Sequence, residues 1–361
     1  MSLLRPFLAL ASAKPSIAQL PTRSVLSVAG SQAPEFLNGV LASAIPKAPH
    51  RPFFSAILNA QGRVLYDLFV YTDASPDGRP RYLIEYDSRA SDGPSLHDLL
   101  KRYVLRAKVK IRDVSQDYDV WAAWGSQDTS VSSAPQWTFA PSGAIEPVWV
   151  NAFEIWPWGS EDRIITDRRA SGMGSRMLVS KGDSPSLAST HDVVSSDLYK
   201  LHRITRGVPE GVIDIHPQTA FPMESNLDVM GALDFRKGCY VGQELTVRTY
   251  HTGVVRKRIL PVLIHESTQI PQSSSSLAQQ NFSSGLDIHP VLNSDRPKPR
   301  GTGRLLSSTH GLGLALLRTD WVGDVEKGDI LLELKDGNKK WFATPSWPDW
   351  WPTRSSSIEQ E

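Results

Sequence analysis

"RKGCYVGQELTVRTYHTG", residues Arg236 to Gly253, contains the only cysteine of this 361-residue chain, Cys239. Gly242 is followed by "QELTVR", which predicts the start of a helix. The free N–H groups and the dipole of such a helix favour negative charge near Cys239. Four basic residues accompany the thiol: Arg236, Lys237, Arg248 and His251. This setting favours the thiolate, which is the nucleophilic and metal-binding form.

One cysteine can form neither an internal disulfide nor a four-cysteine metal site, which is typical of a protein from a reducing compartment. The sequence also has no His-x-x-x-His pair, so a zinc site made by this chain alone is not expected. Several roles stay open for Cys239. A lone cysteine is often a small buried hydrophobe, but a thiolate here would attack an electrophile, be oxidised or ligate iron. Because an iron–sulfur cluster usually takes four protein ligands, Cys239 as a ligand would share the cluster with a partner protein.

Composition indicates a globular protein of two or three domains, with 40% hydrophobic residues, 21% charged residues and a net charge of +1. That balance predicts neither a nucleic-acid partner nor a membrane surface, and no apolar run reaches the roughly 20 residues of a membrane span. The first 34 residues contain no Asp or Glu. We predict a mitochondrial or plastid transit peptide over residues 1–24, with an ordinary frayed terminus as the alternative.

Periodicity predicts an α+β protein followed by a strand-rich part. Residues 25–125 form the first α+β part, with helices at 32–39 and 95–106 and strands at 53–59, 64–71, 81–86, 109–114 and 118–125. Gly62 allows a hairpin between the first two strands. Residues 126–256 form the second part, with a strand at 176–181 and a helix at 191–206. Residues 257–345 predict a β-barrel with a mobile insertion at 267–300, and an aromatic cluster at 347–351 lies in the tail, 346–361.

The segment "KGCYVGQE" resembles the signature of the YgfZ-type proteins, relatives of the glycine-cleavage aminomethyltransferase. The mitochondrial branch of that family is similar at "FLNGV", "ILNAQGRVLYDLFVY", "LHRITRGVPEG", "FPMESNLD", "RTYHTGVVRKRILPV" and "GLGLALL". The resemblance covers residues 26–334 with gaps. It implies a folate-binding, aminomethyltransferase-like α+β fold, in which two pseudo-symmetric parts surround a central cavity and a C-terminal β-barrel follows.

The resemblance also implies a tetrahydrofolate site lined by the hairpin and by the Cys239 segment. Carried over, its cofactor-binding residues are Asn59, Asp67, Lys237, Tyr240, Gln243 and Glu244. Two departures weaken this site. The paired aspartates of aminomethyltransferases become Tyr66 and Asp67, and Thr205 replaces the glutamate that grips the pterin ring. Glu224 and Glu244 do not occupy the motif positions. We therefore expect folate binding to be weak, altered or lost.

The function implied is that of a mitochondrial matrix assembly factor, which works with A-type iron–sulfur carriers to mature four-iron, four-sulfur proteins. Cys239 would be a shared cluster ligand or a reactive thiolate. The alternatives are a folate-dependent one-carbon transferase or repair enzyme, and a binding module with an inert thiol. We expect a monomer or a transient heterocomplex without membrane insertion. The basic run Arg256–Arg258 is either a docking patch or a solvated strand edge.

Overall fold

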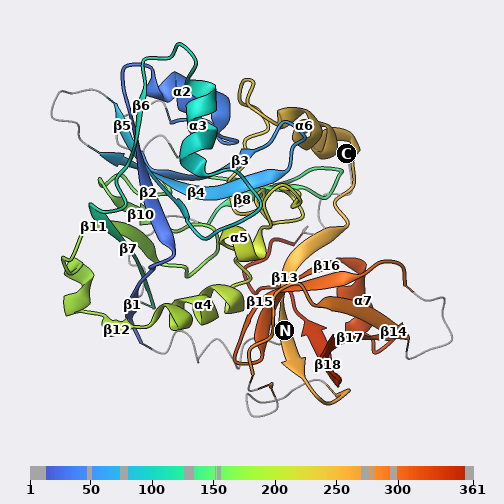
Figure 1. Ribbon diagram of the computed structural model, residues 1–361. Helices are drawn as coiled ribbons and strands as arrows, with labels where there is room; N and C mark the ends of the chain where they lie inside the picture. Colours follow the sequence, from blue (N-terminus) through green and yellow to red (C-terminus); the bar gives the residue numbers. More distant parts are fainter. Residues whose placement is uncertain are drawn as a thin grey trace.

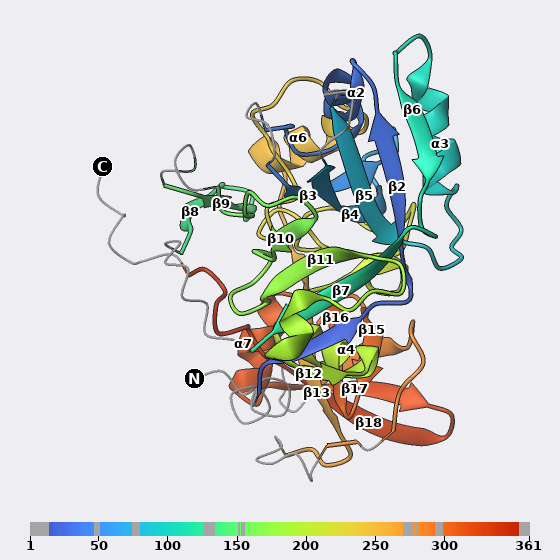
Figure 2. The same cartoon turned by 90° about the vertical axis from the view of Figure 1, so that its left-hand side faces the viewer.

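The computed structural model describes residues 14–46, 51–73, 80–125, 134–150, 152, 156–269, 277–278, 280–292 and 299–353. The described residues form two five-stranded sheets, a closed barrel and a small two-stranded sheet, and Figure 2 shows the two large sheets and the barrel stacked one above the other. This arrangement confirms the predicted α+β fold with a C-terminal barrel, but the strand Tyr118–Trp124, predicted in the first part (25–125), pairs in the second sheet. Within the described residues, no helix is both long enough and apolar enough to cross a membrane.

The first sheet has the order β3-β4-β5-β2-β6 and two helices pack near it (Figure 1). Its elements are β2 (Arg23–Ala29), α2 (Ala33–Val40), β3 (Phe53–Leu58), β4 (Val64–Asp73), β5 (Arg81–Asp87), α3 (Leu96–Val104) and β6 (Lys110–Asp113). The hairpin prediction is confirmed, because β3 and β4 pair antiparallel and Gly62 has φ +72°. Gln32 is the N-cap of α2.

The second sheet has the order β10-β11-β7-β1-β12, in which β1 and β12 are parallel. Its strands are β1 (Ser16–Gln19), β7 (Tyr118–Trp124), β10 (Ile164–Thr166), β11 (Ser175–Ser180) and β12 (Asp192–Val194). The elements outside both sheets are β8 (Gln136–Phe139), β9 (Ile145–Val148), η1 (Ser186–Ser189), α4 (Ser196–Thr205), α5 (Gly211–Asp214) and α6 (Gln243–Thr252). The predicted helix 191–206 is therefore shorter, since β12 occupies its first turn.

The N-terminal strands place a limit on the predicted leader. Residues 1–13 lie outside the described residues, but β1 fills the space between β7 and β12. Arg23 at the start of β2 is 7% exposed and pairs with Glu85 at 2.7 Å. A cut after residue 24 would remove a central strand and a buried cation, so the predicted range 1–24 runs into the folded protein. A leader compatible with this fold ends before Ser16.

The C-terminal part is a closed barrel of order β13-β16-β15-β14-β17-β18. Its elements are β13 (Lys257–His265), β14 (Asp287–Leu292), β15 (Gly303–Thr309), β16 (Leu312–Arg318), α7 (Asp320–Glu326), β17 (Ile330–Asp336) and β18 (Lys339–Pro345). The predicted mobile insertion at 267–300 is wrong over β14, because this strand pairs with β15 and β17 and fully buries Ile288. The polar composition around β14 obscured its alternating pattern.

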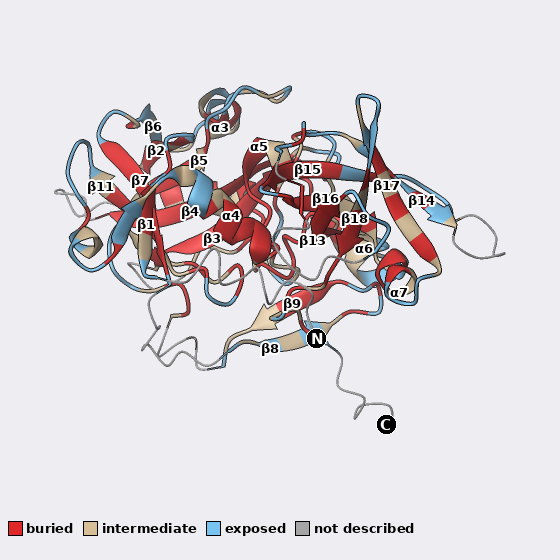
Figure 3. Ribbon diagram, turned by 90° about the horizontal axis from the view of Figure 1, so that it is seen from below, coloured by how far each residue is buried: buried red, intermediate tan, exposed pale blue. Residues whose placement is uncertain are grey.

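Of the four hydrophobic cores among the described residues, the two largest stabilise these parts, and Figure 3 shows buried residues running through both sheets and the barrel. One core is shared by the two sheets, for example by Phe69 of β4 and Leu178 of β11. The other fills the barrel around Trp321, which is 1% exposed. The predicted aromatic cluster of the tail is confirmed, since Trp351 lies 5.1 Å from Trp347 and 5.7 Å from Trp350 between ring centroids.

The basic run at residues 256–258 is divided between surface and core. Arg258 is 2% exposed and donates two hydrogen bonds to Asp228, at 2.5 and 2.9 Å. It also donates to the carbonyl oxygens of Met223 and Gly143. Arg258 is therefore part of neither a docking patch nor a solvated strand edge, because its side chain on β13 points into the protein. Arg256 stays exposed.

Candidate functional site

The segment that carries Cys239 is held rigidly against the turn of the β3–β4 hairpin. Gly242 has φ +83°, and a Cβ there would lie 2.3 Å from the carbonyl oxygen of Asn59. A Cβ on Gly62 would lie 2.9 Å from Leu245. Two glycines therefore allow the backbone of the segment and that of the hairpin to touch. Cys239 lies exposed just before α6, as the sequence predicts for the helix start.

Lys237 fixes the other end of this segment. Its ammonium donates to the carbonyl oxygens of Asn38 and Leu41, both at 2.7 Å, and to that of Ser43 at 3.1 Å. Burial lowers its pKa to about 8. The charge of Lys237 is thus directed at the C-terminal end of α2, where helix carbonyls lack partners. We infer that Lys237 positions the segment.

The other residues predicted beside the thiol serve the same local structure. Asn59 accepts hydrogen bonds from the backbone N–H groups of Gln61 and Arg63, and Gln243 accepts one from Tyr240. Burial raises the pKa of Tyr240, which is 5% exposed, to about 12. Glu244 is exposed in the first turn of α6. The hairpin and the segment therefore bring Asn59, Lys237, Cys239, Tyr240, Gln243 and Glu244 into one region.

The basic residues predicted around Cys239 lie in different surroundings. Arg236 donates to Glu146 of β9 at 3.0 Å, beside Tyr250, whose hydroxyl also donates to Glu146. The ring of Tyr250 stacks on Phe235 at 4.1 Å between centroids. Arg248 and His251 are exposed on α6. A stacked aromatic pair and an ion pair thus attach the segment and α6 to β9.

Asp67 lies apart from this region, in a buried network that joins the two sheets. It is 3% exposed, accepts a hydrogen bond from Gly211 N at 3.0 Å and lies 3.9 Å from Arg23. Burial raises its pKa. Arg23 pairs with Glu85, and Arg176 of β11 approaches the same carboxylate at 3.4 Å. Charged side chains therefore meet between the sheets.

Glu210 lies at the centre of this network. Arg169 approaches it at 2.8 Å, Arg176 donates to it, and so does the Tyr199 hydroxyl at 2.8 Å. Burial acts to raise the pKa of Glu210, but the guanidinium groups of Arg176 and Arg169 hold it well below its usual value. Glu210 is thus an anion that compensates several buried cations.

The two side chains that depart from the aminomethyltransferase pattern both form hydrogen bonds within the protein. The Thr205 hydroxyl is 2% exposed and donates to the carbonyl oxygen of His202 at 2.7 Å. The Tyr66 hydroxyl donates to the carbonyl oxygen of Pro94 at 2.7 Å. Glu224 lines a different cavity, of about 270 Å³, and burial raises its pKa. Tyr66 and Thr205 therefore do not supply the carboxylate that a pterin ring needs as its hydrogen-bond partner.

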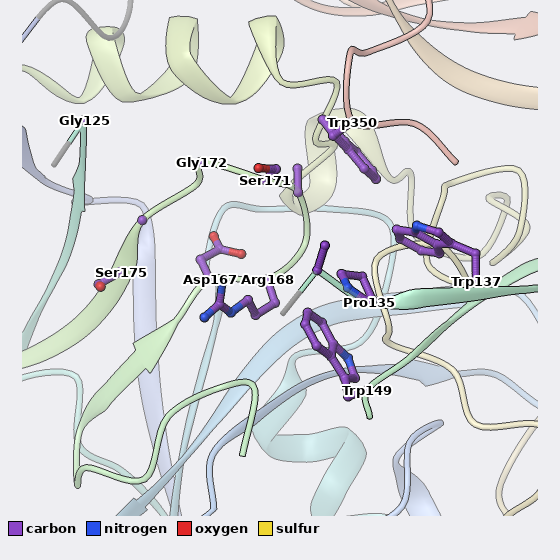
Figure 4. Close-up of a pocket in the computed structure, with 13 residues that line it drawn as sticks. Gly125, Pro135, Trp137, Trp149, Asp167, Arg168, Ser171, Gly172, Ser175 and Trp350 are labelled. Carbon is purple, nitrogen blue, oxygen red and sulfur yellow. The ribbon is translucent and has the colours of Figure 1, made fainter. Parts of the chain in front are cut away.

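A separate aromatic pocket of about 540 Å³ opens beside the loop before β11 (Figure 4). Trp137, Trp149 and Trp350 line it with Arg168 and the glycine loop 171–175. Its loop carries the run "SGMGS", in which Gly172 and Gly174 have φ +79° and +82°. The described lining includes none of the predicted site residues. Single-sequence patterns gave no reason to bring these three tryptophans together.

His202 supports the loop of this pocket and gives it an expected pH dependence. It is 1% exposed, lies 3.1 Å from the carbonyl oxygen of Gly172 and stacks on Trp124. Burial, with a contribution from Arg206, lowers its pKa to about 3. Because the unfolded chain binds this proton near pH 6.5, His202 contributes stability above that pH, and the contribution is lost as pH falls. We expect about 2 kcal/mol less stability at pH 5 than at pH 7 from this group.

Urea unfolding at both pH values measures this loss. The variant His202→Gln should lose less stability on acidification than the unsubstituted protein. Exposed His289 provides the control, since His289→Gln should leave the loss unchanged. Equal losses in all three proteins would contradict a buried neutral His202.

Within the described residues, no cluster of three or more His, Cys, Asp or Glu side chains is arranged to hold a metal ion. Cys239 is therefore not accompanied by further protein ligands in that part of the chain. Any cluster at this thiol would need ligands from elsewhere.

Comparisons with known proteins point to one family. The profile described as "CAF17, C-terminal beta-barrel domain" matches residues 256–353. The chain is 40% identical to the mitochondrial "iron-sulfur cluster assembly factor IBA57 homolog" of Cryptococcus neoformans var. neoformans serotype D, over 90% of this chain and 91% of that protein. It is 34% identical to the homologue of the same name from Mycosarcoma maydis, over 93% and 85%.

A solved structure supports the fold. The crystal structure of glycine cleavage system aminomethyltransferase T from Bartonella henselae matches 95% of this chain and 88% of that chain, with a TM-score of 0.63 and 16% identity. At this identity the match concerns the fold alone. It confirms the predicted aminomethyltransferase-like fold.

Proposed function

This chain belongs to the family of mitochondrial iron–sulfur cluster assembly factors named IBA57 homologues, and we propose that it helps mature four-iron, four-sulfur proteins in the mitochondrial matrix. Its partner in this work is an A-type iron–sulfur carrier protein. The family assignment supports a mitochondrial assembly factor, while the carrier, the matrix and the role of Cys239 are our inferences.

The exposed thiol on a rigid segment carries this proposal. Gly242 and Lys237 fix the backbone on both sides of Cys239, and α6 begins four residues after it. A thiol held in place at the surface reaches an iron atom on another protein without first ordering a loop. Cys239 therefore supplies one ligand to a cluster whose other ligands come from the carrier.

Ligand exchange at the cluster needs no electron donor. The Cys239 thiol releases its proton to solvent, its sulfur forms a bond to iron, and one ligand of the carrier leaves that iron. The segment orients the sulfur, and the surface position leaves room for the carrier. The cluster is cargo in this step.

Tetrahydrofolate has no part in the proposed activity. Thr205 directs its hydroxyl to His202, and Tyr66 replaces one of the paired aspartates. The internal hydrogen bonds of both residues support weak or absent folate binding. Tight, saturable binding in a titration with tetrahydrofolate would instead favour the one-carbon enzyme.

Replacing Cys239 with alanine should remove the shared ligand. We expect the cluster-loaded carrier to change its visible absorption and circular dichroism when mixed with the unsubstituted protein. This change should be absent with Cys239→Ala, which has no thiol at all. Gly238→Ala is a matched control, since a Cβ at that exposed position meets nothing within 4 Å. An unchanged spectrum and complex with Cys239→Ala would show that Cys239 is not a ligand.

A further inference from the structure

A shallow groove of about 400 Å³ lies between α2 and the end of α3, beside the Cys239 segment. Its large apolar lining residues are Phe36, Val40, Tyr103, Val104, Leu105 and Val241. The backbone N–H of Val241 donates to the carbonyl oxygen of Gly39 at 3.2 Å. The groove is therefore continuous with the segment that holds the thiol.

Leu105 at the edge of this groove is unusual in two ways. Its side chain is 89% exposed, the largest fraction among the large apolar residues that the structure describes. Its backbone has φ +44°, which is uncommon for a residue that carries a side chain. Leu105 extends the apolar lining of the groove. A contiguous exposed apolar surface is typical of a contact site for another protein.

A strongly basic segment borders the groove. Residues 101–112 include six Lys or Arg and no Asp or Glu, and all six are exposed. The six are Lys101, Arg102, Arg106, Lys108, Lys110 and Arg112. No ion pair involves them within the described chain. Among the lining residues of the groove, Glu35 is acidic.

Protection of a sheet edge explains part of this charge. β6 is an edge strand, where Lys110 and Arg112 discourage pairing with another chain. That role does not require the basic residues that precede the strand, nor an exposed leucine. The combination of a groove, a projecting apolar side chain and a basic border matches the anatomy of a protein interface.

We propose that this surface, formed by the α2–α3 groove, Leu105 and the basic segment 101–112, docks an acidic face of the carrier that brings its cluster to Cys239. The proposal rests on the proposed function and names the contact that it uses. A protein offers a projecting side chain to fill the groove, which a flat lipid bilayer does not. Continuity through Val241 places the docked protein next to the thiol.

Charge reversal tests the surface. Isothermal titration of a cluster-loaded A-type carrier should give at least about tenfold weaker binding for the double variant Lys108→Glu/Lys110→Glu at about 50 mM salt, and a smaller loss at about 0.5 M. The matched control is Lys327→Glu/Lys335→Glu on the barrel, which reverses two exposed lysines. Leu105→Ser should weaken binding by about tenfold at both salt concentrations.

Three results would count against the proposal in different ways. If the unsubstituted protein does not bind the carrier, the proposed function fails with it. If it binds but Lys108→Glu/Lys110→Glu and the barrel control bind equally well, only the docking surface is wrong. If the unsubstituted protein sediments with phosphatidylglycerol vesicles and the double variant does not, while both bind the carrier equally well, the basic segment binds a membrane surface instead.

Discussion

Replacing Glu210 with glutamine should destabilise the protein by about 3–5 kcal/mol. Glutamine keeps the shape of the side chain but leaves Arg169 and Arg176, both fully buried, without the anion that they share. Arg169 keeps Asp167 at 2.7 Å and Arg176 keeps Glu85 at 3.4 Å, so each guanidinium group loses one of two counter-charges while its desolvation cost stays. The urea midpoint should therefore fall sharply, with little change in the slope of the transition.

An exposed ion pair provides the control for this variant. Glu266 and Lys339 lie 2.6 Å apart with side chains more than half exposed, so Glu266→Gln should cost about 0–1 kcal/mol.

The cost of Glu210→Gln should also depend on pH. Because the pKa of Glu210 is lowered in the folded protein, its contribution to stability is present above the pKa of the unfolded chain and is lost as pH falls below about 4.5. The difference in the free energy of unfolding between Glu210→Gln and the unsubstituted protein should therefore become smaller as pH falls. Equal costs for the two glutamine variants would contradict a central role for Glu210.

Local patterns predicted the parts of the fold that depend on neighbouring residues. Gly62 identified the β3–β4 hairpin, because only a glycine adopts its φ of +72° without cost. The start of α6 after Gly242 also followed from residues close in the chain. Pairings between distant segments left no such pattern. β1 lies beside β12, which is about 175 residues away, and its four residues resemble any short apolar run.

The buried charges could not be predicted from residue type. Arg23, Glu85 and Arg176 occur in strands that mix apolar and polar residues, and arginine or glutamate there usually faces water. Each is buried because a partner of opposite charge arrives from another strand or loop. Arg258 was misread for the same reason. The basic segment 101–112 was visible in the sequence, but a count of charges did not show that Leu105 projects beside it.

Gly242→Ala should test whether the rigid segment matters for the thiol. A methyl group would lie 2.3 Å from the carbonyl oxygen of Asn59, and the residue would keep a φ of +83° that alanine disfavours. Strained backbone costs about 1–2 kcal/mol and a forced contact about 1–3 kcal/mol more. We expect a loss of about 2–5 kcal/mol in urea unfolding.

Gly242→Ala should also weaken the reaction of Cys239 with the cluster while the protein is still folded. At urea concentrations where Gly242→Ala is fully folded, displacement of the segment from Asn59 moves the thiol away from its fixed position, so the spectral change of a cluster-loaded carrier should weaken. Gly238→Ala, one residue before the thiol, has open space and should change stability by less than about 0.5 kcal/mol. If Gly242→Ala loses stability but keeps the full spectral change, the hairpin contact serves folding alone, and the position of Cys239 depends on Lys237.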